Sequence, residues 1–238
     1  RAEHYLVKGV KPELSIMVKD LGAAGLAAVW ARENTREAIW DAMARKEVYA
    51  TTGSRLKVRG FGGWDFKADE VHRPDFAKQG YARGVPMGGD LTHAAKGKTP
   101  SFMIRALRDA DGANIDRVQV IKGWLDKKGK THERIYDVAV SGDRKIGKDG
   151  RARTPVGSTV DLEKPGYTNT IGAPLLAAHW VDPDFDAKQR AFYYVRVIEI
   201  PTPRWTAYDK QFFNNEMPKD TAMTVQDRAY TSPIWYTP

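Results

Sequence analysis

The sequence predicts an α+β fold, in which an α/β segment precedes an antiparallel β-sandwich-like region. Two observations lead to this prediction. A capped helix, a short strand and a glycine-containing loop follow one another within residues 34–55, which is the order typical of an α/β layer or barrel. From Ser101 onward, short strands alternate with turns rich in Asp and Gly, as in antiparallel sandwiches. We therefore expect an α/β region over 1–66, a linker over 67–100 and a β-rich region over 101–238.

The composition indicates a folded chain with a packed core. Of the 238 residues, 42% are hydrophobic and 11% are aromatic. No apolar run approaches the roughly 18 residues of a membrane span, and the longest one, Leu21 to Ala31, contains two glycines. Cysteine is absent, which excludes disulfides, thiolate zinc sites and cysteine nucleophiles. We expect no membrane span.

The net charge of +8 favours anionic partners. The basic residues are scattered, and the densest groups fall in turns such as Asp126–Lys130. Nucleic-acid binding proteins instead cluster Lys and Arg among exposed aromatic residues, so we expect no nucleic acid partner. A small substrate that carries phosphate or sulfate is compatible with this charge.

The first predicted elements are a helix and a strand. Residues 1–20 have weak periodicity and indicate an irregular lead-in. Asn34 provides a helix N-cap, and Glu37 completes a capping-box pattern. Helical spacing then predicts one buried stripe, made of Ala38, Ile39, Ala42 and Met43. A strand of β-favouring residues follows over 48–52, and Gly53 ends it.

The remaining elements are predicted to be strands. Residues 67–100 contain three prolines and a Gly-Gly pair, which is why we expect a linker there. Alternating patterns then predict four strands, over 102–106, 115–121, 134–140 and 192–200. The last of them has large apolar residues on both faces, so we expect it to lie in the centre of a sheet.

The loop Thr51-Thr-Gly-Ser-Arg55 is the best candidate for contact with a substrate. The hydroxyls of Thr52 and Ser54, the close backbone approach at Gly53 and the fixed charge of Arg55 suit an oxyanion or phosphate. In parallel α/β architectures, functional loops lie at this end of the strands. The alternative is an ordinary exit from a strand, with an arginine that pairs at the surface.

A second candidate is the segment Pro201-Thr-Pro-Arg204-Trp205. The prolines restrict the backbone, so the loop can hold Arg204 against an aromatic face or a carboxylate. In the structural interpretation, the segment locks the β-rich region onto the α/β region. In the functional one, Arg204 and Trp205 form one wall of a substrate cleft, because clefts favour domain junctions. Both interpretations stay open.

The sequence contains no local metal-binding motif. No two of the five histidines lie within five residues of each other, and neither His-x-His nor His-Glu-x-x-His occurs. His132 and Glu133 fall at the start of a predicted hairpin arm, where a cross-strand role is favoured. Asp182-Pro-Asp-Phe-Asp186 has the spacing of a calcium loop but lacks its later glycine and glutamate, so we expect a turn. We predict no metal ligand and no identifiable catalytic residue in this chain.

Three segments carry a resemblance to a known family: Glu33–Gly53, Arg190–Asp209 and Ala229–Pro238. They resemble the domain of unknown function 3604 family, which is related to the PHP-type metal-dependent phosphoesterases. The resemblance implies that residues 1–66 supply the closing α/β segment of a PHP-like distorted barrel, and that residues 101–238 pack back on it. It also implies that the metal-binding motifs of the enzyme lie upstream of this chain.

The resemblance leads to a functional hypothesis. The chain would be the C-terminal portion of a metal-dependent hydrolase, in which water activated by divalent Mn, Zn or Fe hydrolyses a phosphoester or a similar anionic ester. Its partner would be the N-terminal part of the same enzyme, and this chain alone would be inactive. The alternative is a non-catalytic β-rich binding or interaction module. Family members often look exported, which favours the periplasm and leaves the cytoplasm open.

Overall fold

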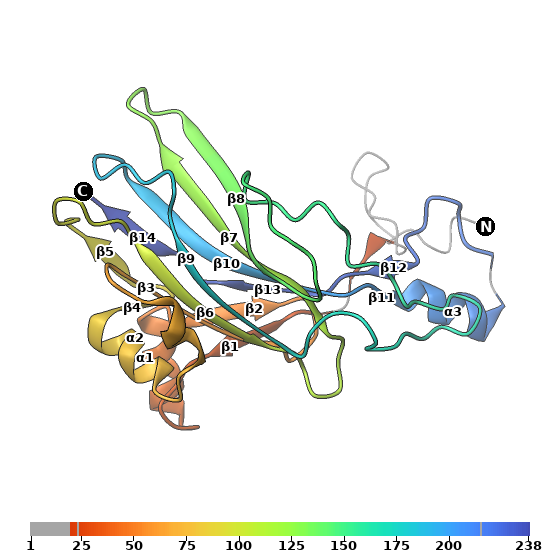
Figure 1. Ribbon diagram of the computed structural model, residues 1–238. Helices are drawn as coiled ribbons and strands as arrows, with labels where there is room; N and C mark the ends of the chain where they lie inside the picture. Colours follow the sequence, from red (N-terminus) through yellow and green to blue (C-terminus); the bar gives the residue numbers. More distant parts are fainter. Residues whose placement is uncertain (1–19, 23, 215) are drawn as a thin grey trace.

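The computed structural model describes residues 20–22, 24–214 and 216–238 (Figure 1). Of the irregular lead-in expected over residues 1–20, all but Asp20 lies outside these residues. In the described parts, eight strands form a larger sheet. They are β1 (Leu26–Val29), β2 (Val48–Thr51), β5 (Asp90–Thr92), β7 (Ile115–Leu125), β8 (Thr131–Val140), β10 (Ala191–Glu199), β13 (Arg228–Thr231) and β14 (Ile234–Thr237).

A smaller sheet and several short elements complete the described fold. The smaller sheet is made of β4 (Gly84–Pro86), β3 (Lys57–Gly63), β6 (Ser101–Leu107) and β9 (Leu175–Val181), in that order. A short ribbon joins β11 (Thr202–Pro203) to β12 (Thr224–Val225). The helices are α1 (Arg36–Ala44), the 3₁₀ helix η4 (Ala68–His72), α2 (Phe76–Arg83) and α3 (Trp205–Phe213). None of the helices in the described ranges is long and apolar enough to cross a membrane.

Strand β10 is the centre of the larger sheet, as its two apolar faces predicted. It pairs antiparallel with β7 along one edge, and β13 and β14 share the other edge. Strand β7 pairs in turn with β8, and these two form a long hairpin arm. The side chains of Tyr193, Val195 and Val197 point to one face of β10, while Phe192 and Tyr194 point to the other.

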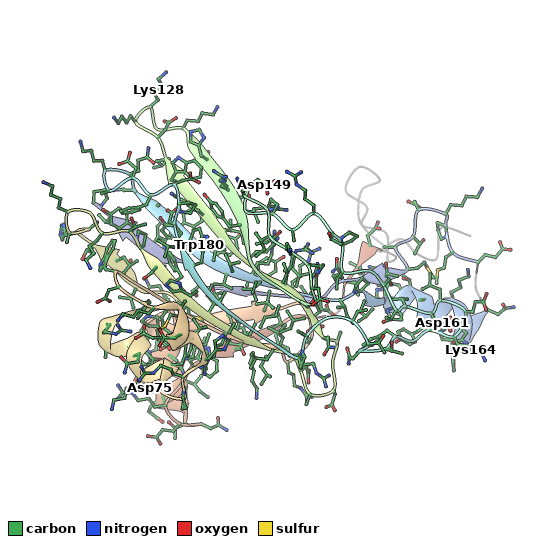
Figure 2. All side chains as sticks on the ribbon, viewed as in Figure 1. Asp75, Lys128, Asp149, Asp161, Lys164 and Trp180 are labelled. Carbon is green, nitrogen blue, oxygen red and sulfur yellow. The ribbon has the colours of Figure 1, made fainter. Side chains whose placement is uncertain are left out.

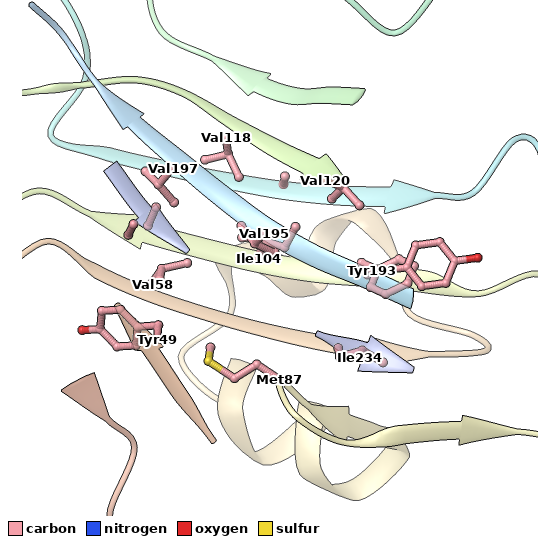
Figure 3. Close-up of a cluster of buried hydrophobic side chains, with 14 of the residues drawn as sticks. Tyr49, Val58, Met87, Ile104, Val118, Val120, Tyr193, Val195, Val197 and Ile234 are labelled. Atoms are coloured by element: carbon pink, nitrogen blue, oxygen red, sulfur yellow. The ribbon is translucent and has the colours of Figure 1, made fainter. Parts of the chain in front are cut away.

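The two sheets pack face to face around one core (Figure 3). Val195 and Val197 of β10 lie in the same buried cluster as Ile104 of β6 and Val58 of β3. Each aliphatic side chain that is fully buried in this way contributes roughly 1.5–3 kcal/mol to folding. The alternation of apolar and polar residues on these strands is the sequence pattern that creates this interface.

The smaller sheet is covered on its other face as well. There, α2 and η4 pack Phe76 and Val71 against Phe61 and Met103 of the sheet. The rings of Phe61 and Phe76 meet edge to face, with centroids 5.4 Å apart. Helices α1 and α2 both lie on this side of the molecule (Figure 1). The outer face of the larger sheet, in contrast, carries aromatic side chains that stay half-buried or exposed.

The predicted barrel segment is wrong. Strands β1 and β2, which flank α1, are antiparallel neighbours, with Leu26 opposite Thr51. Strand β2 then pairs antiparallel with β13 near the C-terminus. A barrel of the expected kind needs parallel strands, whereas this chain is mostly β with antiparallel sheets. The order helix, strand and glycine loop is a local signal, and it does not specify the direction of the next strand in the sheet.

Helix α1 also differs in detail from the predicted one. Its N-cap is Thr35 rather than Asn34, and Thr35 Oγ1 accepts a hydrogen bond from the backbone N–H of Ala38 at 3.3 Å. Ala42 is buried as predicted, but Met43 is 54% exposed. The helix contacts the rest of the protein through a narrow stripe, because it packs at the edge of the fold and not between two layers.

Candidate ligand-binding site

The loop after β2 holds the predicted residues Thr52 and Arg55 against acidic side chains. Thr52 Oγ1 donates to Asp227 Oδ1 at 2.6 Å, and the backbone N–H of Arg55 donates to Asp109 Oδ2 at 2.7 Å. Between them, Gly53 has a φ of 148°, a backbone conformation that residues other than glycine rarely adopt. These contacts fix the loop. They also place the negatively charged carboxylates of Asp109 and Asp227 beside the loop, and these charges disfavour the binding of an anionic ligand there.

Glu199 lies at the end of β10, beneath this loop. The residue is 1% exposed, and within the described residues neither Glu199 Oε1 nor the buried Ser54 Oγ makes a hydrogen bond of ordinary geometry. Burial raises the pKa of Glu199 to about 7; the nearby Ser54 hydroxyl opposes this shift, and the charges of Asp227 and Asp109 add to it. Ser54 is thus the predicted residue that lies beside the carboxyl with the raised pKa.

Arg204 and Trp205 contact a different part of the chain. Both side chains donate to the backbone carbonyl of Leu21, at 2.5 Å from Arg204 Nη2 and 2.9 Å from Trp205 Nε1. The guanidinium carbon of Arg204 also lies 5.2 Å from the centroid of the Trp205 ring. These contacts join the start of α3 to the segment that precedes β1. A role of either side chain in substrate binding stays a prediction.

The described histidines and carboxylates do not fit the divalent metal that the resemblance implies. Over residues 20–22, 24–214 and 216–238, no three His, Asp or Glu side chains come close enough to share a metal ion. His179 Nε2 lies 2.8 Å from the carbonyl oxygen of Phe66, and His132 Nε2 lies 2.9 Å from Asp126 Oδ2. Both rings are engaged in local hydrogen bonds. We therefore assign no chemical step to a metal in this chain.

A groove of about 690 Å³ opens where the hairpin arm, the start of β10 and β14 meet. The strand register places four residues in one row across the outer face of the larger sheet. Phe192 lies opposite Gly123 on one side and Trp235 on the other, and Gly123 lies opposite Glu133. A second row, nearer the tip of the arm, contains Thr131, Leu125, Arg190 and Thr237.

The floor of the groove depends on a glycine. A Cβ atom at Gly123 would lie 2.3 Å from Cζ of Phe192, so a side chain at that position would displace the ring. Because the side chain is missing, the Phe192 ring lies across β7. Its centroid is 5.1 Å from that of Trp235 and 6.4 Å from that of Tyr194. The three rings form a continuous strip on the open face, and Trp235 is 46% exposed.

The opposite face of the arm is stiffened by a second aromatic contact. Trp124 and His132 are cross-strand neighbours, and their rings stack with centroids 5.2 Å apart and planes at 15°. This is the cross-strand role predicted for His132. The arm projects from the sandwich, with Lys128 at its tip (Figure 2). Its rigidity holds Glu133 and Leu125 in place on the side of the groove.

The rim of the groove carries one charge of each sign. Arg190 and Glu133 are both exposed, and neither side chain has a hydrogen-bond or ion-pair partner in the part of the chain that the structure describes. Leu125 beside them is 44% exposed. The groove therefore combines an apolar floor with a free donor and a free acceptor.

Sequence reasoning did not identify this groove. It placed the candidate site at Thr52, Ser54 and Arg55 and at Arg204 and Trp205. The alternation that includes Phe192 and Tyr194 predicts a central strand and does not by itself indicate a groove. Trp235 lies more than 40 residues away in the sequence, and only the strand register places it beside Phe192.

A family model described as "Protein of unknown function (DUF3604)" matches residues 3–238. No curated protein and no solved structure matches the chain.

Proposed function

The chain belongs to the DUF3604 family, and from this premise we propose that it acts as a non-catalytic β-rich binding module. The ligand occupies the groove on the outer face of the larger sheet. The observation that supports this most directly is the aromatic strip of the exposed Trp235 and the half-buried Phe192 and Tyr194, which leads into a concave site between two strands and a hairpin arm.

The dimensions and chemistry of the groove agree with those of a ligand site. Small-molecule sites enclose roughly 300–1,000 Å³ and combine apolar walls with a few polar groups that orient the ligand. The groove of about 690 Å³ has this combination, since its aromatic floor meets Arg190 and Glu133 at the rim. A ligand that covers the exposed face of Trp235 removes apolar surface from water, and this favours binding.

The test is a binding screen with matched tryptophan variants. Ligands found by thermal shift are titrated against the parent chain, Trp235→Ala and Trp40→Ala. Trp40 lies on α1, is not among the residues that line the groove, and is 69% exposed, so it serves as the control. We expect Trp235→Ala to weaken binding by about tenfold or more, the effect of removing at least 1.4 kcal/mol of stacking, and Trp40→Ala to leave it unchanged. Equal affinities of all three proteins would exclude the groove.

A second candidate function follows from the resemblance. A longer protein that contains this chain as its C-terminal portion would be a PHP-like metal-dependent hydrolase of phosphoesters. The observation that favours it is the buried pair of Glu199 and Ser54 beneath the loop of Thr52 and Arg55. A carboxyl that keeps its proton near neutral pH is suited to proton transfer. The loop, together with Arg204 and Trp205, would then contact the substrate.

This second candidate is tested by metal content and by one substitution. Elemental mass spectrometry is expected to find at least one Mn, Zn or Fe per molecule in the longer protein, and near-zero metal in the 238-residue chain. Arg55→Ala is expected to lower phosphoesterase turnover without changing the unfolding midpoint. Unchanged turnover would remove Arg55 from the site, and a metal-free longer protein would remove the hydrolase hypothesis. Cell fractionation tests the periplasmic location.

A further inference from the structure

The charges at the rim of the groove restrict the ligand. Arg190 and Glu133 lie in adjacent rows of the same face, and neither side chain makes a hydrogen bond or an ion pair with another described residue. An anionic ligand would be attracted by Arg190 but repelled by the carboxylate of Glu133. A cationic ligand would be attracted by Glu133 but repelled by Arg190. A neutral ligand that offers both donors and acceptors uses both side chains, since guanidinium only donates and carboxylate only accepts.

The shape of the floor adds a second restriction. The rings of Phe192 and Trp235 are tilted by 52°, and those of Phe192 and Tyr194 are stacked at 15°. The strip therefore presents several apolar facets in sequence and not one flat slot. The negative face of an aromatic ring attracts C–H groups, which carry a small positive charge. A ligand made of repeated units, each with an apolar C–H face, can lie along such a strip.

A polar row marks the end of the strip. Beyond Tyr194, Arg196 Nε donates to Gln119 Oε1 at 2.7 Å, and Gln119 Nε2 donates to Asp137 Oδ1 at 2.6 Å. These groups are satisfied by one another, in contrast to Arg190 and Glu133. The free polar groups thus lie at the groove end of the aromatic strip.

We propose that the ligand of the groove is a neutral oligosaccharide, whose pyranose rings pack their C–H faces on Trp235 and Phe192 while their hydroxyls bond to Arg190 and Glu133. This rests on the binding function proposed above and names its ligand class. A pyranose has the required properties together: an apolar ring face, hydroxyls at its edge that both donate and accept, and no charge. A polyphosphate or a nucleic acid strand meets repulsion at Glu133.

The test is a glycan array that contains neutral and acidic oligosaccharides, followed by calorimetry with the best ligand. The variants are Trp235→Ala, Arg190→Gln and Glu133→Gln, with Trp40→Ala as the control. We expect a neutral glycan to bind, Trp235→Ala to weaken it by about tenfold or more, and each rim variant to weaken it by roughly threefold to tenfold. The control is expected to bind like the parent chain.

The two rim variants decide the charge of the ligand. Tighter binding by Glu133→Gln would indicate an anionic ligand, and tighter binding by Arg190→Gln a cationic one; either result overturns the proposal. An array without a bound neutral glycan overturns it as well. If a different small molecule then binds in a manner that depends on Trp235, the binding function stands and only the ligand class is wrong.

A further measurement tests the other occupants of this face. Analytical ultracentrifugation of the parent chain and of Trp235→Ala shows whether the strip mediates self-association. A dimer that is lost in Trp235→Ala would assign the face to a second copy of the chain and would overturn the oligosaccharide proposal. A monomer in both cases, together with glycan binding, supports it.

Discussion

Glu199 is enclosed at the end of β10, and the folded protein therefore holds its proton more tightly than the unfolded chain does. The pKa is raised from 4.5 to about 7, mainly by burial. For an acid with a raised pKa, the unfolded state loses its proton first as pH rises. The free energy of unfolding is therefore highest below about pH 4.5 and falls until the pH reaches about 7. The fall from this one group is roughly 3–4 kcal/mol.

The substitution Glu199→Gln is expected to remove this contribution, because the amide does not titrate. Urea unfolding of both proteins between pH 4 and pH 8 measures it. Relative to the parent chain, Glu199→Gln should gain stability as the pH rises, with most of the change between about pH 4.5 and 7. Parallel pH profiles of the two proteins would show that the carboxyl of Glu199 is ionised in the folded state with an ordinary pKa.

At the scale of the element, the unit β1–α1–β2 shows what local signals determine. The helix forms where the capping pattern and the apolar spacing predicted it, and the strand follows where β-favouring residues are dense. The cap itself is shifted by one residue, because Thr35 has the extended backbone of an N-cap and an oxygen aimed at the N–H of Ala38. Both Asn and Thr suit this position, so the sequence alone did not separate them.

A pair of alanine substitutions checks the cap. Thr35→Ala is expected to lower the free energy of unfolding by about 1 kcal/mol, since it leaves an N–H of the first helical turn without its partner. Asn34→Ala, one residue away, is expected to change it by less than about 0.5 kcal/mol. Chemical denaturation measures both. A larger effect at Asn34 would place the cap where the sequence pattern first indicated it.

The whole molecule is held by a core that the two sheets share. Ile104 of β6 is fully buried and lies in one cluster with Val195 of β10, which belongs to the other sheet (Figure 3). Removing its side chain leaves a cavity in contact with both sheets. The sheets should therefore lose stability together.

Ile104→Ala is expected to cost 2–5 kcal/mol, and the unfolding curves from tryptophan fluorescence and far-ultraviolet circular dichroism should shift by the same amount. Ile146→Ala makes the same change at a position 37% exposed outside the main strands, and should cost less than about 1 kcal/mol. Two separate transitions in Ile104→Ala would mean that the sheets unfold as independent units.

The sequence predicted several strands well, and its candidate site residues stay a prediction. Strands β6, β7, β8 and β10 lie where alternation and Asp/Gly turns indicated them, because these signals are local and repeat within a few residues. The loop residues Thr52, Ser54 and Arg55 do lie together, but the acidic side chains around them, Asp109, Asp227 and Glu199, come from distant segments. Their influence on charge is invisible in the loop sequence.

By itself, the sequence determined the β-rich character of most of the chain, the helix after Thr35 and the family to which the chain belongs. The tertiary structure decided the rest. It made an expected barrel strand an antiparallel partner of β13, and it placed Phe192 between Trp235 on one side and Gly123 on the other, where the missing side chain leaves space for the Phe192 ring. The physical reason is that strand direction and register are set by pairing between residues far apart in the chain, whereas propensity and periodicity act only on neighbours.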